Sequence, residues 1–562
     1  MSDTLVFDMS SASEGSPSVF VRKDWLSILD NMNRNYQGNQ CIIDTSQLAN
    51  SNKYMSYREG YLLVPLVMTL TPGKDATPAQ VDLPVTDYIM GLKNWYGSIF
   101  HSFSLDYNGT TIVQQTPFIG MWNCFKLMTS LSLNDIVTQG ATIGFYPDRS
   151  SSWEYNPAGT GAGFSICNNV NEVLPTVVTA LSNGTIGNEG MLQRQLYWNF
   201  DLNATNGMGA STNSTLISQS NTQLLWKSYI FKSNGDIQQI GITAQVYLKH
   251  LHSFFERVPL LKGVFMKLIL NLNQSSITFD ITAGGKMSCS SVTSPLGGVS
   301  PSMIASGANG SGSQDLALTP ATGLIASIAV GQSCLNTQQS TYAIQSPVGG
   351  GSVQLILPSY TFNPVFETSM LSSPIKKIVY EDVYQYTVTN VSANSNFTYL
   401  ITNGIANVKS VLVLPYYASA SNLVGTGVFA PPFQSPWDPA GAGPTSPLCL
   451  FTNFNVQVSG QNAIYNVERY SFEQFSNQLY GQNAVNGGMT DGLTSSLIGF
   501  KDFEQEYCYY YVNVGRMLPI EEAVPKAINL IGINASAKAI DMYVFISYGV
   551  EVSIDILSGA RV

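Results

Sequence analysis

Along most of the chain, apolar and polar residues alternate with a period of two, which is typical of half-buried β-strands. Near the C-terminus, Val552, Ile554 and Ile556 share one face of such a segment, and polar residues occupy the other. The same alternation occurs at residues 240–248 and 266–272. Sustained helical periodicity is absent, and Gly, Pro, Asn and Ser recur between the apolar segments. The pattern predicts an all-β chain with short helices, built as β-sandwiches.

Three stretches lack this alternation. Residues 284–350 contain Gly-Gly, Ser-Pro and Asn-Gly-Ser-Gly clusters, and residues 149–235 are rich in Asn, Ser, Thr and Gly. Such composition is typical of exposed loops, and a stable scaffold tolerates long loops because closure entropy grows slowly with length. We expect both stretches to be long surface loops inserted between strands. Residues 1–20 are expected to form an N-terminal arm that orders on assembly.

An internal repeat relates the two halves of the chain. The segment FSLDYNG in the first half matches FNVQVSG in the second, at a constant shift of 351 positions. Asn108-Gly109 is a strong hairpin signal and Ser459-Gly460 a weaker one, because the central positions of a tight hairpin turn require positive φ. We predict that Asn108, Gly109, Ser459 and Gly460 form equivalent structural hairpin turns.

Two further matches flank the hairpins in the same order. After the first hairpin, Thr116 and Pro117 are expected to supply the N-cap and first turn of a short helix. A corresponding helix should follow the second hairpin and end at Gly481. Upstream, residues 63–65 (Leu-Val-Pro) match residues 413–415 (Val-Leu-Pro) at a shift of 350. Three matches in one order indicate a tandem duplication of one sandwich domain.

The duplication predicts two domains, residues 21–373 and residues 374–562. The first contains both long loops, and the second begins near Ile375. Charged residues make up only 11% of the 562 positions, and the formal net charge is −10, whereas globular chains usually carry about 25% charged residues. A polar but weakly charged surface suits a protein whose faces are covered by copies of itself.

Candidate catalytic or metal-binding residues are few. The only histidines are His101, His250 and His252; the last two would share one face of a strand, but a third metal ligand is not evident and the adjacent phenylalanines indicate a packed strand end. No nucleophile elbow or HExxH motif occurs, and the glycines at 349–351 lack the Lys of a phosphate loop. We predict no catalytic residue, no metal, no cofactor and no enzymatic activity.

Acidic residues keep one alternative open. Asp502, Glu504 and Glu506 alternate on a predicted strand face, and Glu521 is adjacent to Glu522. Paired carboxylates perform glycoside hydrolysis, so a carbohydrate-binding or glycan-hydrolysing β-sandwich is the alternative function. We favour the interpretation that these carboxylates form a solvated edge that discourages wrong strand pairing.

Cysteines and basic residues show no functional spacing. Seven cysteines are scattered without a CxxC pair, which predicts buried free thiols in a reducing compartment. The densest Lys/Arg groups are pairs, which are too small for specific nucleic-acid binding. The longest apolar runs are about half as long as a membrane helix, and the N-terminus has no secretory signal pattern. We therefore expect no specific nucleic-acid binding and no transmembrane segment.

Several longer segments resemble the double jelly-roll major capsid proteins of virophages and polinton-like viruses. The similar segments are DYIMGLKNWYGSIFHSFSLDYNGTTIVQQTPFIGMWNCFKLMTSLS, GFYPD, FFERVPLLKG, PSYTFNPVFETSML and IKKIVYEDVYQY. The resemblance implies two eight-stranded jelly rolls in one chain. It also implies three chains in a pseudo-hexameric capsomer, which tiles an icosahedral shell around a double-stranded DNA genome.

The same resemblance implies the partners and the location. The partners would be further copies of the chain, neighbouring capsomers, and penton and minor capsid proteins. The location would be the virion, after synthesis and assembly inside the infected host cell. A minor vertex protein is a rival interpretation, but such proteins are normally single jelly rolls, and the duplicated length argues against it.

Overall fold

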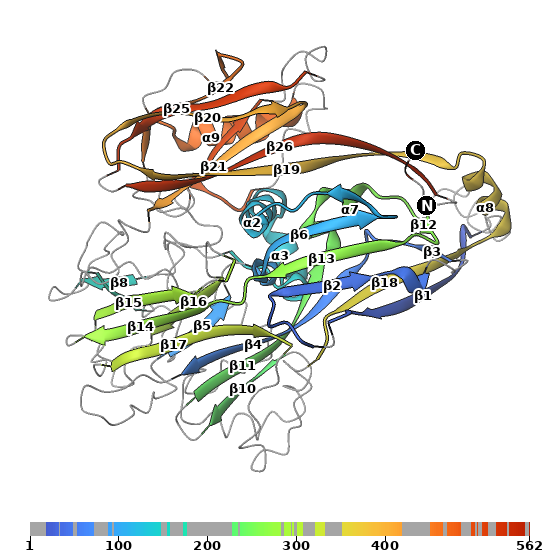
Figure 1. Ribbon diagram of the computed structural model, residues 1–562, viewed down its shortest axis with the longest axis horizontal. Helices are drawn as coiled ribbons and strands as arrows, with labels where there is room; N and C mark the ends of the chain where they lie inside the picture. Colours follow the sequence, from blue (N-terminus) through green and yellow to red (C-terminus); the bar gives the residue numbers. More distant parts are fainter. Residues whose placement is uncertain are drawn as a thin grey trace, which may run out of the picture.

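A computed structural model of the protein describes most of the strands in both halves (Figure 1). The described residues are 18–32, 34–48, 53–71, 88–92, 95–147, 154–157, 172–176, 228–233, 237–282, 286–293, 295–296, 301–306, 321–331, 351–418, 450–464, 469–484, 496–500, 503, 509–514, 524–536, 539–556 and 561. The expected N-terminal arm lies outside these residues, apart from its last three positions.

The second half forms a β-sandwich of two four-stranded antiparallel sheets, in the orders β19-β26-β21-β24 and β20-β25-β22-β23. In chain order these are strands first-eighth-third-sixth and second-seventh-fourth-fifth, which is the jelly-roll arrangement. The strands are β19 (Ile375–Val391), β20 (Asn396–Ile405), β21 (Val408–Tyr417), β22 (Phe451–Val458), β23 (Gln461–Asn462), β24 (Tyr510–Asn513), β25 (Lys526–Asn534) and β26 (Ile540–Asp555).

The first half contains the same arrangement within a larger structure. Strand β18 pairs with β1 and β4, and β4 also pairs with β11, while the second sheet has the order β2-β13-β6-β7. These are again the first-eighth-third-sixth and second-seventh-fourth-fifth strands of a jelly roll. Their bounds are β1 (Phe20–Leu29), β2 (Gln40–Asp44), β4 (Tyr61–Thr71), β6 (Phe100–Tyr107), β7 (Thr110–Val113), β11 (Ile237–Tyr247), β13 (Met266–Leu272) and β18 (Gln354–Phe362).

The two stretches predicted to be loops contain strands, so that prediction is wrong in part. In residues 284–350, β17 pairs with β4 and extends the main sheet of the first roll. Its Ala326, Ile328 and Val330 are buried, because alternating apolar residues supply one half-buried face. The added strands are β8 (Glu154–Pro157), β9 (Glu172–Thr176), β10 (Ser228–Ser233), β15 (Lys286–Thr293), β16 (Ser302–Ser306) and β17 (Ala321–Val330); further strands of this half are β3 (Tyr54–Met55), β5 (Tyr88–Leu92), β12 (Leu261–Lys262) and β14 (Ser276–Thr282).

The predicted shift of 350 between residues 63–65 and 413–415 is wrong by one residue. Leu62 is fully buried and Leu63 half-buried, and the inner residues of β4 continue at even positions. In β21, Val413 pairs with Tyr510, whose ring contacts Phe451 of the opposite sheet at 4.6 Å. Val413 therefore points inward and corresponds to Leu62, at the hairpin shift of 351. A one-residue slip exchanges the two faces of a strand.

Short helices connect the strands. Helix α2 begins after Phe118, whose φ of 56° is left-handed, and no side chain caps it; the predicted Thr116 cap is wrong. Helix α9 continues past Gly481, so that predicted end is wrong too. The helices are α2 (Ile119–Ser130), α3 (Leu133–Ile143), α6 (Leu248–Leu251), α7 (Ser253–Arg257), α8 (Pro364–Leu371) and α9 (Phe472–Ala484), with 3-10 turns η1 (Ser46–Leu48) and η2 (Tyr96–Ile99).

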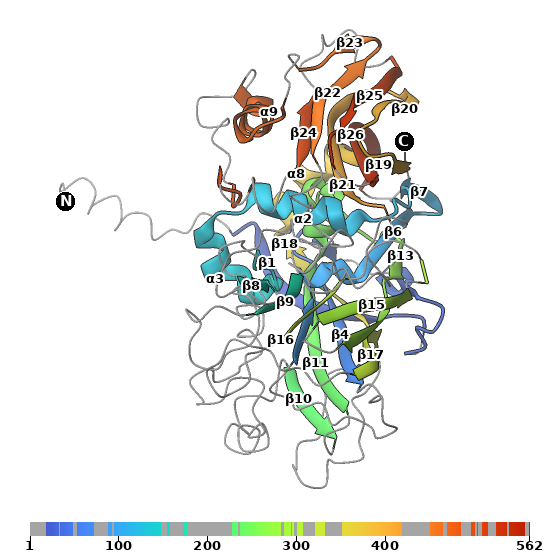
Figure 2. The ribbon, with the colours of Figure 1, turned by 90° about the vertical axis from the view of Figure 1, so that its left-hand side faces the viewer.

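The two rolls are stacked, with α2 lying between them (Figures 1 and 2). Helix α8 precedes the first strand of the second roll. Strands β19 and β26 pair from Ile375 to Val391, and Figure 1 shows them running beyond the second sandwich and over α7 of the first roll. The rolls are thus joined by packing over a broad surface, which we call the seam.

Candidate functional site: the hairpins and the seam

The two predicted hairpin turns have the same backbone geometry. Asn108 and Gly109 have φ of 46° and 79° and join β6 to β7. Ser459 and Gly460 have φ of 51° and 85° and join β22 to β23. Positive φ at both central residues is the geometry that two-residue hairpin turns adopt to match strand twist.

The polar contacts around the two hairpins correspond as well. Asn108 donates its backbone N–H to the carbonyl of Phe265 at 2.9 Å, and Ser459 donates to the carbonyl of Ala527 at 2.8 Å. In each roll, the last residue of the strand before the turn pairs with a residue of the seventh strand. The acceptor is the residue immediately before that partner. Each hairpin is therefore fastened to the seventh strand of its roll in the same way.

A cross-strand side-chain bond closes each hairpin. Thr111 donates to Asp106 at 2.7 Å, and Gln457 donates to Asn462 at 3.0 Å. These pairs are again 351 positions apart. The correspondence extends from backbone conformation to individual hydrogen bonds, although the side chains differ.

The apolar part of the seam consists of aromatic side chains of α2 against one sheet of the second roll. The ring of Phe118 lies 5.0 Å from that of Tyr543, and Trp122 lies 6.4 Å from Phe545. Phe125 lies 5.3 Å from Tyr511. Edge-to-face and tilted aromatic pairs at such spacings add attraction to the buried area. The outer face of β26, β21 and β24 is thus covered by the first roll.

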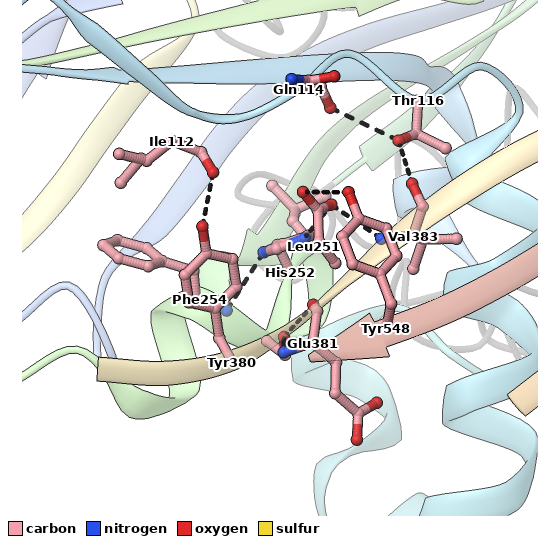
Figure 3. Close-up of polar contacts among 12 residues, drawn as sticks. Ile112, Gln114, Thr116, Leu251, His252, Phe254, Tyr380, Glu381, Val383 and Tyr548 are labelled. Carbon is pink, nitrogen blue, oxygen red and sulfur yellow. Dashed lines mark hydrogen bonds and ion pairs between the residues drawn. The ribbon is translucent and has the colours of Figure 1, made fainter. Parts of the chain in front are cut away.

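The polar part of the seam surrounds β19 (Figure 3). Tyr380 donates its hydroxyl to the carbonyl of Ile112 at 2.6 Å, and Thr116 donates to the carbonyl of Val383 at 2.7 Å. The Ser253 hydroxyl donates to the carbonyl of Glu381 and accepts from the Glu381 N–H. Each bond joins the first roll to β19, so Thr116 fastens the rolls together rather than capping a helix.

At the centre of the polar seam, His252 contacts Asp382. Both side chains are buried, and Nε2 of His252 lies 3.3 Å from Oδ1 of Asp382. The other histidine nitrogen, Nδ1, accepts the backbone N–H of Phe254 and caps α7. A nitrogen that accepts carries no proton, so His252 is the neutral tautomer whose Nε2–H donates to Asp382. Asp382 also accepts from the Val383 N–H and the Tyr548 hydroxyl.

The predicted histidine geometry is wrong, because His250 and His252 do not share a strand face. His250 lies in α6, and His252 lies between α6 and α7. Burial, with the charges of Lys249 and Lys126, lowers the pKa of His250 to about 3. Burial also lowers the pKa of His101. The lowered pKa values of His250 and His101 disfavour an added proton on these two side chains. No metal-binding group of three or more His, Cys, Asp or Glu exists among the described side chains.

The acidic residues of the alternative function lie outside the described residues. They are Asp502, Glu504, Glu506, Glu521 and Glu522. Between the first two, Phe503 donates its backbone N–H to the carbonyl of Gly499, four residues earlier; the predicted strand face itself lies outside the described residues. Two cysteines, Cys41 and Cys124, are buried thiols outside any disulfide, as expected; the other five cysteine side chains are outside the described ones.

Sequence reasoning missed the seam. The segment IKKIVYEDVYQY, which carries part of the resemblance, contains the β19 residues of its polar part, and His252 and Ser253 lie immediately before FFERVPLLKG. Their spacing in the chain gave no sign that they touch, because residues from three strands and two helices meet only after both rolls have formed. In the part of the chain that is described, no helix is both long and apolar enough to span a membrane.

Comparison with known proteins gives a structural likeness only. No family model matches the sequence, and no curated protein matches it. A chain in the cryo-EM structure of the Sputnik virophage is 12% identical, with a TM-score of 0.51 over 98% of this chain and 89% of that one. The mavirus major capsid protein is 10% identical, with a TM-score of 0.44 over 98% and 90% of the two chains. The Faustovirus major capsid protein is also 10% identical, with a TM-score of 0.44 over 96% and 91%.

The likeness to the Sputnik chain covers 98% of this chain and so extends over both halves. At so low an identity it establishes the architecture. The chain therefore has two jelly rolls in tandem, a fold that it shares with a chain of the Sputnik virophage.

Proposed function

We propose that this chain is a major capsid protein, the principal structural subunit of a viral shell. The observation that carries the proposal is the pair of matched jelly rolls, joined by a buried seam, with the fold of a chain from a virophage particle. Jelly rolls also occur in lectins and other proteins. The duplication and the sparse surface charge favour tiling over chemistry.

The finer part of the proposal concerns assembly. Three copies would form a capsomer with six rolls and a near-hexagonal outline, since closed rings are the usual arrangement of identical chains. Capsomers would tile an icosahedral shell around double-stranded DNA in the virion, together with penton and minor capsid proteins. Synthesis and assembly would take place inside the infected host cell.

The long connections support a polarity for each roll. In an antiparallel jelly roll, the connections after the first, third, fifth and seventh strands leave from the same end. In this chain the longest connections do so: residues 72–99, 114–236, 273–353, 418–450 and 463–509. We assign this end of each roll to exposed or inter-capsomer contacts, with residues 149–235 and 284–350 as the main contributors. Limited proteolysis of intact particles should cut in these two stretches first, and cuts confined to other regions would reject the assignment.

The mass and shape of the purified protein test the proposed function. Light scattering should give the mass of three chains, and negative-stain microscopy should show hexagonal particles or empty shells. Obligate interfaces typically bury about 2,000–5,000 Å², so the assembly should persist on dilution. A protein that stays monomeric at every concentration and forms no shell would contradict the proposal.

A further inference from the structure

Strand pairing identifies which residues of the two rolls occupy the same place. In the second roll, Leu412 of β21 pairs with Phe545 of β26 and Tyr511 of β24. In the first roll, Tyr61 of β4 pairs with Ile356 of β18 and Tyr247 of β11. Both triplets point away from the sandwich interior, and the two central residues are 351 positions apart. The triplets therefore mark the same outer face of the same sheet.

These equivalent faces differ in burial. In the second roll, Leu412 and Phe545 are 0% exposed and Tyr511 is 3% exposed, because α2 covers them. In the first roll, the corresponding residues are only half-buried. At its edge, Trp25 is 53% exposed and Leu29 58% exposed. We call this surface the open face; its residues are Trp25, Leu29, Tyr61, Leu63, Tyr247 and Ile356.

The open face is largely apolar and aromatic, and two ammonium groups lie over its rings: Lys23 is 5.1 Å from the ring of Trp25, and Lys249 is 5.3 Å from the ring of Tyr247. The ring of Trp25 lies 6.0 Å from that of Tyr61, which lies 5.6 Å from that of Tyr247. The three rings cross the sheet from β1 to β11. Exposed apolar surfaces of this kind mark interaction sites in soluble proteins.

The helix that covers the second roll has a counterpart. Helix α2 follows the hairpin of the first roll, and α9 follows the hairpin of the second. Of the thirteen residues of α9, Glu473 alone is charged. Phe472, at its start, is half-buried, and its ring lies 5.8 Å from that of Phe500, which is 59% exposed. A helix with a single charged residue beside exposed aromatic residues can be buried at little desolvation cost.

We propose that α9 of a second copy covers the open face of the first roll, as α2 covers the equivalent face of the second roll within the chain. The contact is head-to-tail, because the helix and the face lie on different rolls. Repeated three times, it returns to the first copy and closes a ring of six alternating rolls. The inference rests on the proposed trimeric capsomer and specifies the surfaces that hold it together.

The first test places a charge on the open face. Trp25→Glu should convert the trimer to monomers in light scattering, because α9 would lose the Trp25 ring and would bury a carboxylate whose neighbouring cation, Lys23, is already paired with Glu59 at 2.6 Å. Leu400→Glu is the matched control: Leu400 is also 53% exposed but lies on β20, in the other sheet of the second roll. It should leave the trimer intact. In both variants the fold of the single chain should keep its wild-type thermal stability, since both side chains are largely in solvent. A Trp25→Glu variant that remains a trimer overturns the inference.

The second test is a cross-link between copies. When the helices are aligned on their first aromatic residues, Phe118 and Phe472, the shift is 354 rather than the 351 of the hairpins, and Ser476 takes the place of Trp122. Trp122 contacts Phe545, whose counterpart is Ile356. Ser476→Cys combined with Ile356→Cys should therefore form a disulfide between copies under mild oxidation. The covalent ladder on a denaturing gel should end at three chains, because the ring closes. Each single variant controls for cross-links that involve the native cysteines. If the double variant cross-links no more than the single variants do, the inference is contradicted.

The outcomes separate this inference from the proposed function. Suppose that the wild-type protein forms trimers, that Trp25→Glu does not dissociate them, and that the cysteine pair does not cross-link. The capsid proposal then stands, and the assignment of surfaces is wrong. If the wild-type protein forms neither trimers nor shells, the proposed function itself fails, and this inference fails with it.

Discussion

The second roll consists of two four-stranded sheets, whereas the first adds further strands until its main sheet has ten. In spite of this, the hairpin corner has the same turn, the same bond to the seventh strand and the same cross-strand contact in both rolls. The features that close the sandwich are shared, and those that determine its contacts differ. The comparison teaches that the two rolls share the closed sandwich and its hairpin corner, and differ in the strands and contacts outside it.

The seam makes this comparison testable, because the outer face of β26, β21 and β24 in the second roll is buried against α2 of the first. Phe125 contacts both Tyr509 and Tyr511. Phe125→Ala should lower the free energy of unfolding by about 3–5 kcal/mol, as is typical when a buried aromatic residue is truncated. Chemical denaturation measures it, with Leu400→Ala as an exposed control that should change stability by less than about 0.5 kcal/mol. A loss below about 1 kcal/mol would show that the second roll does not depend on α2.

The polar seam gives the next largest effect. Asp382→Ala leaves the Val383 N–H and the Nε2–H of His252 buried without an acceptor, which should cost about 2–3 kcal/mol. The control lies on the same pair of strands: Glu551 is half-exposed and pairs with the exposed Lys377 at 2.9 Å. Glu551→Ala should cost less than about 1 kcal/mol. Equal losses for the two variants in urea unfolding would contradict a buried role for Asp382.

The hairpins allow the sharpest comparison of the two rolls. Gly109→Val and Gly460→Val should each cost about 1–2 kcal/mol, because a β-branched residue disfavours positive φ. A Cβ at either position would meet no atom within 4 Å, so backbone strain alone sets the cost. The two losses should therefore agree within about 0.5 kcal/mol. If one variant unfolds the protein and the other leaves it unchanged, the turns are not equivalent.

Two variants separate the two hydrogen bonds of His252, one to Asp382 and one that caps α7. Asn has an oxygen placed to keep the α7 cap but does not reach Asp382, and Gln has an amide nitrogen placed to reach Asp382 but loses the cap. His252→Asn and His252→Gln should each lower stability by about 1 kcal/mol, the usual net value of one hydrogen bond. Thermal unfolding of both variants and of His252→Ala checks this. If His252→Ala is no worse than either, one of the two bonds contributes nothing.

The last prediction concerns the dependence of stability on pH, and no change is expected near neutral pH. All three histidines lie in the first roll. Burial lowers the pKa of His250 from 6.5 to about 3, so the unfolded chain binds more protons between these values and stability falls as pH falls through that window. His250→Gln should make stability depend less steeply on pH in this window. The slope should fall by the equivalent of up to one bound proton. His101 contributes to the remaining slope, since burial also lowers its pKa. Parallel curves for the variant and the wild type would contradict this prediction.

Several features of the fold could be predicted from the sequence because they depend on neighbours along the chain. Alternation indicated β13 and β26, and the Asn-Gly and Ser-Gly pairs marked turns whose φ values are positive in both rolls. The same reasoning failed for β17, where glycine-rich flanks hid the alternation of Ala326, Ile328 and Val330. It also failed for the register of β4, because neighbouring apolar residues match equally well at shifts of 350 and 351.

The sequence by itself determined the β-rich character, the duplication and the hairpin corners, since these follow from periodicity and from the φ that a residue can adopt. Only the tertiary structure decided that His252 meets Asp382, that Thr116 bonds to β19, and that one outer face is covered while its counterpart is open. Sheet order and the stacking of the rolls bring together residues more than a hundred positions apart. No local spacing encodes such pairs, because they depend on how whole faces pack.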